Sequence, residues 1–170
     1  PRMQLELHQL QIPPGNQLLL TGINWSMFET LLAELGETRA TRLSYSHGRL
    51  EIMVPLPDHE VGKVLIGNLV EIMFEELNIN FWNLGSTTLK NAQMTQAVEP
   101  DDCFYITQEA RVRNKSRLDL TQDPPPDLAI EIDITSRTRF DNYQALGVPE
   151  LWRYDGQRLQ INLLQDGKYV

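Results

Sequence analysis

Cysteine is almost absent from the chain, which has a single one, Cys103, among 170 residues. One thiol excludes an internal disulfide framework and is typical of a protein kept in a reducing compartment. Long apolar runs are absent too, since no stretch approaches the roughly 18 residues that indicate a membrane-spanning helix. Residues 1–4 resemble neither a signal peptide nor a transit peptide. We therefore expect a cytoplasmic protein without a membrane partner.

Several common catalytic motifs are also missing. The sequence has no glycine-rich phosphate loop, no Cys-x-x-Cys, no His-Glu-x-x-His and no Gly-x-Ser-x-Gly. Basic residues are too few to balance the acidic ones, so the net charge is −8 and the pI is near 4.8. Non-specific nucleic-acid binders usually display a basic surface. A nucleic-acid partner would therefore require local positive charge, part of which a bound cation could supply.

The chain does have the composition of an ordinary globular protein. With 170 residues, 41% of them hydrophobic, and no linker or repeat, it predicts one α/β domain (of the α+β type) over residues 1–170. Helical periodicity and alternating patterns follow one another along the chain. The predicted helices cover residues 24–36, 58–77 and 139–146; the predicted strands cover residues 43–45, 49–54, 79–89, 97–106, 128–134, 150–154 and 158–164.

The longest predicted helix follows two prolines and begins with Asp58 as its N-cap. Its apolar residues recur at helical spacing and predict a buried stripe. That stripe consists of Val61, Val64, Leu65, Leu69, Ile72, Met73 and Leu77.

The stretch from residue 127 to residue 134 alternates strictly between two kinds of side chain, which predicts a strand. One face is aliphatic and is expected to pack beneath the long helix through Leu128, Ile130, Ile132 and Ile134. The other face consists of Asp127, Ala129, Glu131 and Asp133. Three acids on one face repel each other unless a cation lies among them. A half-exposed strand with its polar residues outward is the alternative.

A second acidic stretch, Glu99-Pro100-Asp101-Asp102, lies where a strand begins or bulges, because Pro100 cannot donate a ladder hydrogen bond. Asp101 precedes Glu131 by thirty residues, which suits neighbouring strands joined by a loop. Two carboxylates roughly 4–6 Å apart would form an oxygen-rich site for Mg²⁺ or Mn²⁺. The alternative is a turn acid and an unrelated exposed strand acid.

Three segments resemble the Uma family, a large bacterial family that is abundant in cyanobacteria and has a restriction-endonuclease-like PD-(D/E)XK core. They are Pro100-Asp101, residues 126–132 (PDLAIEI) and residues 143–152 (YQALGVPELW), of which Gly-Val-Pro-Glu-x-Trp is the most specific. The resemblance extends over residues 25–164. It implies a central mixed β-sheet flanked by helices, with an N-terminal helix and β-hairpin as an extension.

The resemblance also implies a site. Asp101 and Glu131 would bind Mg²⁺ or Mn²⁺, with the carbonyl of Ile132 as a third ligand. The lysine that the motif has two residues after the acid is Asp133 in this chain. The following helix is then expected to supply the missing cation through Arg139.

Further candidates flank this site. His59, which also matches the family pattern, and Glu60 could reach it from the start of the long helix; a capping first turn is the alternative. The basic loop 111–117 is expected to contact a nucleic-acid backbone. Its basic residues are Arg111, Arg113, Lys115 and Arg117.

These features predict a Mg²⁺-dependent endonuclease that hydrolyses DNA phosphodiester bonds. The main alternative is a catalytically weak or inactive relative that serves as a binding or interaction module. A carboxylate-based hydrolase of small phosphoesters is a third. A homodimer is plausible because paired sites often cut a two-stranded substrate.

Overall fold

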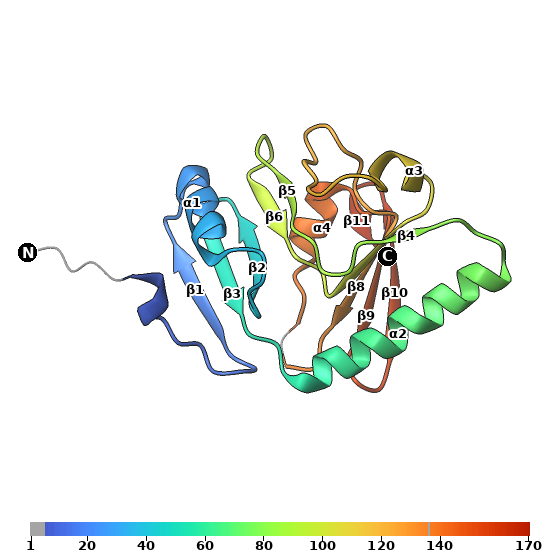
Figure 1. Cartoon of the computed structure of the whole chain (residues 1–170), viewed down its shortest axis with the longest axis horizontal. Helices are drawn as coiled ribbons and strands as arrows, with labels where there is room; N and C mark the ends of the chain where they lie inside the picture. Colours follow the sequence, from blue (N-terminus) through green and yellow to red (C-terminus); the bar gives the residue numbers. More distant parts are fainter. Residues whose placement is uncertain (1–5, 136) are drawn as a thin grey trace, which may run out of the picture.

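Two β-sheets lie side by side in the structure, a computed structural model that describes residues 6–135 and 137–170 (Figure 1). The first sheet is antiparallel and has the order β1-β3-β2-β6-β5. Its strands are β1 (Gln17–Thr21), β2 (Arg42–Ser46), β3 (Arg49–Met53), β5 (Leu89–Asn91) and β6 (Gln96–Val98). Helix α1 (Trp25–Leu35) is capped by Asn24, whose Oδ1 accepts from the backbone N–H of Met27 at 2.9 Å. It packs on this sheet through Phe28.

The second sheet is mixed and has the order β11-β10-β9-β8-β7-β4. Its strands are β4 (Trp82–Asn83), β7 (Asp102–Tyr105), β8 (Leu128–Ile132), β9 (Glu150–Tyr154), β10 (Leu159–Gln165) and β11 (Lys168–Tyr169). Strands β8 and β9 are parallel, with Glu131 opposite Arg153. A mixed sheet flanked by helices is the core that the resemblance implies. The predicted N-terminal helix and β-hairpin are α1 and β2–β3, but the hairpin is part of a larger sheet that also contains β1, β5 and β6.

The predicted strands 79–89 and 97–106 are each divided between the two sheets. Residues 96–98 pair with β2 in the first sheet, whereas residues 102–104 pair with β8 in the second. The break falls at Pro100, which has no N–H for a continuous ladder. The same segment that carries Asp101 therefore leads the chain from one sheet into the other.

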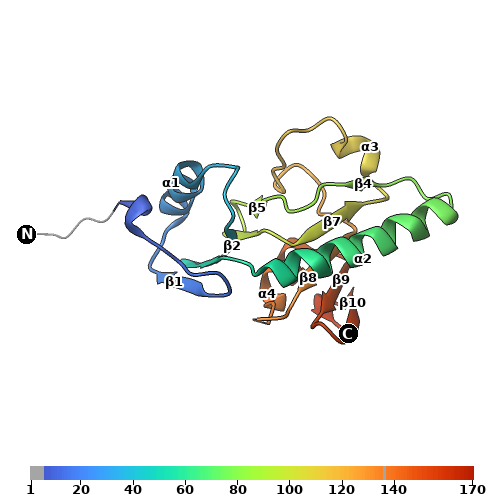
Figure 2. The same ribbon diagram turned by 60° about the horizontal axis from the view of Figure 1, so that its bottom comes forward.

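Helix α2 (Pro57–Glu76) crosses one face of the second sheet (Figure 2). Its N-cap is Leu56 rather than the predicted Asp58, because Pro57 fits the first helical position, where no N–H is needed. The described residues contain no helix that is long and apolar enough to cross a membrane.

The predicted buried stripe of this helix is wrong. Leu128, Ile130 and Ile132 do pack beneath α2, but they contact a different side of it, formed by Ile66, Val70 and Phe74. The predicted stripe residues Val61, Val64, Leu65, Leu69, Ile72, Met73 and Leu77 are exposed.

Glycine explains which side of α2 faces the sheet. A Cβ at Gly62 would lie 3.1 Å from the Ile132 side chain, and one at Gly67 would lie 2.8 Å from the Asp102 carboxylate. The helix therefore approaches the sheet along its two glycines. Ile134, the last residue of the predicted aliphatic face, lies beyond the end of β8 and is 36% exposed.

The opposite face of the second sheet is covered by α4 (Phe140–Leu146), with α3 (Glu109–Val112) at one end (Figure 1). Tyr143 and Leu146 of α4 pack there against Ala129 of β8 in a second apolar cluster. Helix α4 ends at Gly147, whose φ of 74° suits a left-handed C-cap. Because α4 faces the side of β8 that carries Glu131, it adjoins the candidate site.

Candidate functional site

Asp101 lies between the two sheets, one residue before β7 begins. Its Oδ2 accepts a hydrogen bond from the backbone N–H of Ile132 at 2.8 Å, and the residue is only 3% exposed. This bond ties the turn after Pro100 to the end of β8. The thirty-residue separation read from the sequence therefore corresponds to neighbouring strands, β7 and β8.

Glu131 projects from β8 on the side away from α2, and its carboxyl group is hydrogen-bonded to that of Asp101. The two candidate acids therefore lie on the same side of the sheet and in contact. Burial raises the pKa of Asp101, and burial together with the neighbouring Asp101 raises the pKa of Glu131 well above its usual value. Without a cation the pair thus favours sharing a proton, as adjacent buried carboxyls do.

Tyr143 holds this pair from α4, and sequence reasoning did not assign it a role. Its phenol donates a hydrogen bond to Oε1 of Glu131. Burial, followed by the proximity of Glu131, raises the pKa of the phenol well above its usual value, so Tyr143 remains a donor. Tyr143 opens the YQALGVPELW segment, but its contact with Glu131 depends on how α4 packs against β8.

The carboxyl pair opens into a small cleft of about 80 Å³ between the two sheets. Three guanidinium groups line the same cleft, those of Arg42, Arg137 and Arg139. The site therefore combines buried carboxyls with positive charge, which the net charge of −8 does not reveal. Arg42 and Arg137 have no distinguishing sequence pattern and were missed.

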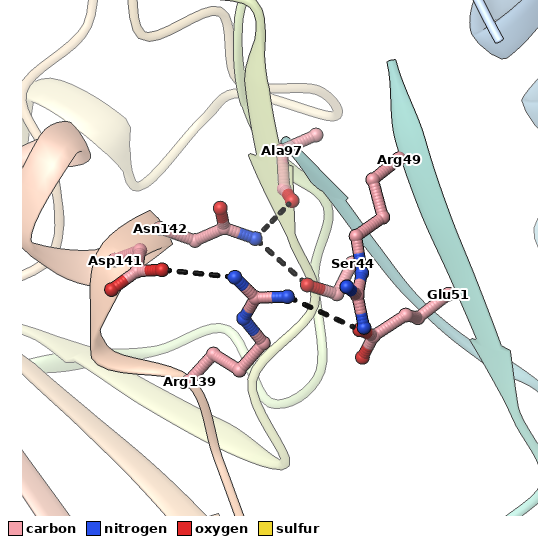
Figure 3. A network of polar contacts seen from close by, with 7 residues as sticks. All are labelled: Ser44, Arg49, Glu51, Ala97, Arg139, Asp141 and Asn142. Carbon is pink, nitrogen blue, oxygen red and sulfur yellow. Dashed lines mark hydrogen bonds and ion pairs between the residues drawn. The ribbon is translucent and has the colours of Figure 1, made fainter. Parts of the chain in front are cut away.

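Arg139 is the N-cap residue of α4, because the helix begins at Phe140, one residue later than predicted. Its guanidinium lies between two carboxylates, 3.0 Å from Asp141 and 3.6 Å from Glu51 (Figure 3). Glu51 also pairs with Arg49, at 2.9 Å. The hydrogen bond and charge of Asp141 raise the pKa of Arg139 further, so it is always a cation and not a proton donor.

The helix beside Arg139 is anchored to the first sheet. The side-chain amide of Asn142 donates to Oγ of Ser44 at 2.7 Å and to the carbonyl of Ala97 at 3.2 Å (Figure 3). Asn142 is buried. These bonds fix α4 against β2 and β6, so the position of Arg139 depends on both sheets.

Asp133, at the position of the motif lysine, is bound to other groups. Nε of Arg153, on β9, donates to its Oδ2 at 2.7 Å, and Thr138 donates to its Oδ1 through both its N–H and its hydroxyl. The guanidinium of Arg153 also lies 4.8 Å from the Phe140 ring. Asp133 lines the cleft, but these bonds occupy both its oxygens.

His59 and Glu60 occupy different environments although they are adjacent on α2. His59 is buried; its Nε2 lies 3.1 Å from the Thr135 hydroxyl, and its charge is among the influences that lower the pKa of Asp101. Glu60 is exposed and lies 3.7 Å from Arg42, which lines the cleft. In the part of the chain that the structure describes, no hydrogen bond or ion pair joins either residue to Asp101 or Glu131.

The basic segment 111–117 is a loop only in part, because α3 includes Arg111. All four of its cations have partners: Arg111 with the Gln122 carbonyl, Arg113 with Glu109, Lys115 with Asp123, and Arg117 with Glu37. Arg117 lines a larger cavity of about 430 Å³, together with Arg39, Arg42 and Lys90. That cavity shares Arg42 and Glu99 with the cleft of the carboxyl pair.

The donor set suits a hard divalent cation. Among the described residues no group of three or more His, Cys, Asp or Glu side chains forms a ready-made metal cage. Mg²⁺ does not require one, since it is often held by one or two carboxylates and completed by water and substrate phosphate. Asp101 and Glu131 provide such a pair, and the arginines around them could receive a phosphate.

A comparison with known protein families found a match. The model of the family Uma2, described as "Putative restriction endonuclease", matches residues 25–170. The match includes both acids, Tyr143 and Arg139. No curated protein is similar enough to the chain to count as a match.

Proposed function

Because the chain belongs to the Uma2 family, we propose that it is a metal-dependent endonuclease that hydrolyses phosphodiester bonds in DNA. The observation that carries the proposal is the contact between the carboxyl groups of Asp101 and Glu131 in a cleft lined by three arginines. Two carboxylates recruit the cation, and the arginines offset the negative charge of the substrate.

In this proposal Asp101 and Glu131 bind Mg²⁺ or Mn²⁺, and the Ile132 carbonyl is a third ligand. A divalent cation there would polarise the scissile phosphate and lower the pKa of an attacking water. Tyr143 keeps Glu131 in the orientation required for binding the cation. Arg139 stabilises the charge that develops on the phosphate, because a guanidinium can donate two parallel hydrogen bonds to phosphate oxygens.

The larger cavity next to the cleft supports a polymeric substrate. Its arginines and lysine could bind phosphates flanking the scissile one, with Arg42 common to both cavities. Arg111, Arg113 and Lys115 would contact the backbone only at the edge of this surface, since none of them lines the cavity.

The decisive experiment is a cleavage assay on plasmid and oligonucleotide DNA with Mg²⁺ or Mn²⁺. The parent should cut, whereas Glu131→Ala and Asp101→Ala should lose cleavage and bind Mn²⁺ more weakly in calorimetry. Glu34→Ala is the matched control, since it removes an exposed carboxylate on α1 that does not line the cleft. Cleavage that survives Glu131→Ala unchanged would contradict the proposal.

One observation favours a second candidate, an interaction module without catalysis. The position of the motif lysine holds an acid, Asp133, whose two oxygens accept hydrogen bonds from Arg153 and Thr138. This position therefore supplies no positive charge to the site. This alternative predicts Mn²⁺ binding that depends on Asp101, with no cleavage of any DNA. The same calorimetric and cleavage measurements therefore separate the two functions.

A further inference from the structure

Helix α2 is apolar on two opposite sides. One side packs on the second sheet through Ile66, Val70 and Phe74. The other, which we call the outer face, is 54–68% exposed at each of its residues: Val61, Val64, Leu65, Leu69 and Ile72. A surface helix normally has a polar outer side. The outer face therefore indicates a contact that the isolated chain does not make.

Strand β10 adds exposed apolar residues on the side of the sheet that α2 covers. Ile161 pairs with Trp152, which packs in the cluster beneath α2, so both residues lie on the α2 side of the sheet. Leu163 lies on the same side two residues later. Both are partly uncovered, at 52% and 43% exposed.

We propose that a second copy of this chain packs on the outer face of α2 and the adjoining side of β10. With roughly 100 Å² for each exposed aliphatic side chain, these seven residues offer roughly 700 Å² per copy, close to the roughly 800 Å² per partner of a standard protein–protein interface. Monomers seldom expose an apolar patch above roughly 600 Å². The proposal does not rest on nuclease activity.

One feature of α2 suits a two-fold, antiparallel pairing of the helices. Asn68 is exposed near the middle of the helix among the apolar residues, where a two-fold axis would pair its amide with the same amide of the second copy.

The oligomeric state tests the proposal directly. By sedimentation equilibrium the parent should have twice the chain mass of 19.6 kDa at micromolar concentration. The double variant Leu65→Glu/Leu69→Glu should sediment at 19.6 kDa, with its dissociation constant raised by more than about a hundredfold. Circular dichroism should remain that of the parent, because both residues are exposed. Met27→Glu on α1 is the control and should remain dimeric, since Met27 is also an exposed apolar helix residue.

Cross-linking tests the placement of the axis. Asn68→Cys should form a disulfide-linked dimer under mild oxidation, whereas Met27→Cys should not; Cys103 is fully buried and does not interfere. A parent chain that is monomeric at 100 μM would overturn the proposal. This holds even if its outer face binds lipid vesicles in a flotation assay. A dimer that persists in the double variant would also overturn it. A dimer in which Asn68→Cys fails to cross-link would refute the antiparallel axis at Asn68.

Discussion

The phenol of Tyr143 donates a hydrogen bond to Glu131, and this bond links helix α4 to strand β8 at the candidate site. Both residues lie in the segments that resemble the Uma family. The same carboxyl group interacts with that of Asp101, so Tyr143 supports one member of the acid pair directly. We therefore consider Tyr143 a positioning residue for the acid pair.

Tyr143→Phe should weaken Mn²⁺ binding and slow single-turnover DNA cleavage by about 10–100-fold, because the supporting hydrogen bond to Glu131 is lost. The aromatic ring stays in the core, so the thermal midpoint should change little. Calorimetry and quench-flow cleavage measure the two effects. Tyr169→Phe is the control, since that phenol donates to the Val148 carbonyl, and it should leave both constants unchanged.

Arg139→Ala should reduce single-turnover cleavage at saturating Mn²⁺ by about a hundredfold, as expected when one donor to a developing charge is removed. Arg139→Lys should retain or raise the rate, because lysine keeps the charge and can also transfer a proton. Arg49→Ala removes the other arginine that pairs with Glu51 and should cut like the parent (Figure 3). Equal rates in all four proteins would exclude Arg139 from the mechanism.

Ile130→Ala should lower the free energy of unfolding by about 2–5 kcal/mol, because Ile130 is fully buried beneath α2 and its truncation leaves a cavity. Ile134→Ala should cost less than about 1 kcal/mol, since Ile134 lies beyond the strand and is partly exposed. Urea unfolding measures both. Similar losses in the two variants would show that the aliphatic face continues to residue 134.

Asp102 should make stability depend on pH. Burial beneath α2 raises the pKa of Asp102 to about 6 from 3.8, so the folded state binds this proton more tightly than the unfolded state. The resulting stabilisation is fully present below pH 4 and is lost as the pH rises to about 6, which amounts to about 2–3 kcal/mol. Asp102→Asn has no charge to bury, so its stability relative to the parent should increase over that window. Urea titrations between pH 4 and 7, with EDTA present, test this; a constant difference would contradict it.

Local patterns were sufficient to predict several parts of this fold. The alternation in residues 128–132 correctly gave a strand with its isoleucines beneath the long helix. The thirty-residue spacing between Asp101 and Glu131 correctly predicted that they belong to neighbouring strand segments. Asn24 was correctly named as a possible cap of α1, because its side chain can accept from the first turn.

Other features depend on packing that no local pattern contains. The apolar periodicity of α2 fits two faces, and Gly62 and Gly67 decide between them by allowing close approach to the sheet. The sequence indicates only that Asp133 replaces the lysine of the catalytic motif, and not that it forms an ion pair. Its partner Arg153 lies twenty residues away, on a strand whose parallel pairing had to be known first.

The passage of the chain through Pro100 from the first sheet to the second has a consequence for biosynthesis. Asp101 is positioned by β6, which pairs with residues from the first third of the chain, and by Ile132, which is synthesised thirty-one residues after it. Tyr143 must follow before Glu131 is held in place. A nascent chain therefore cannot complete the acid pair until the residues up to Tyr143 have left the ribosome, so a chain that stops short of α4 would lack the supported site.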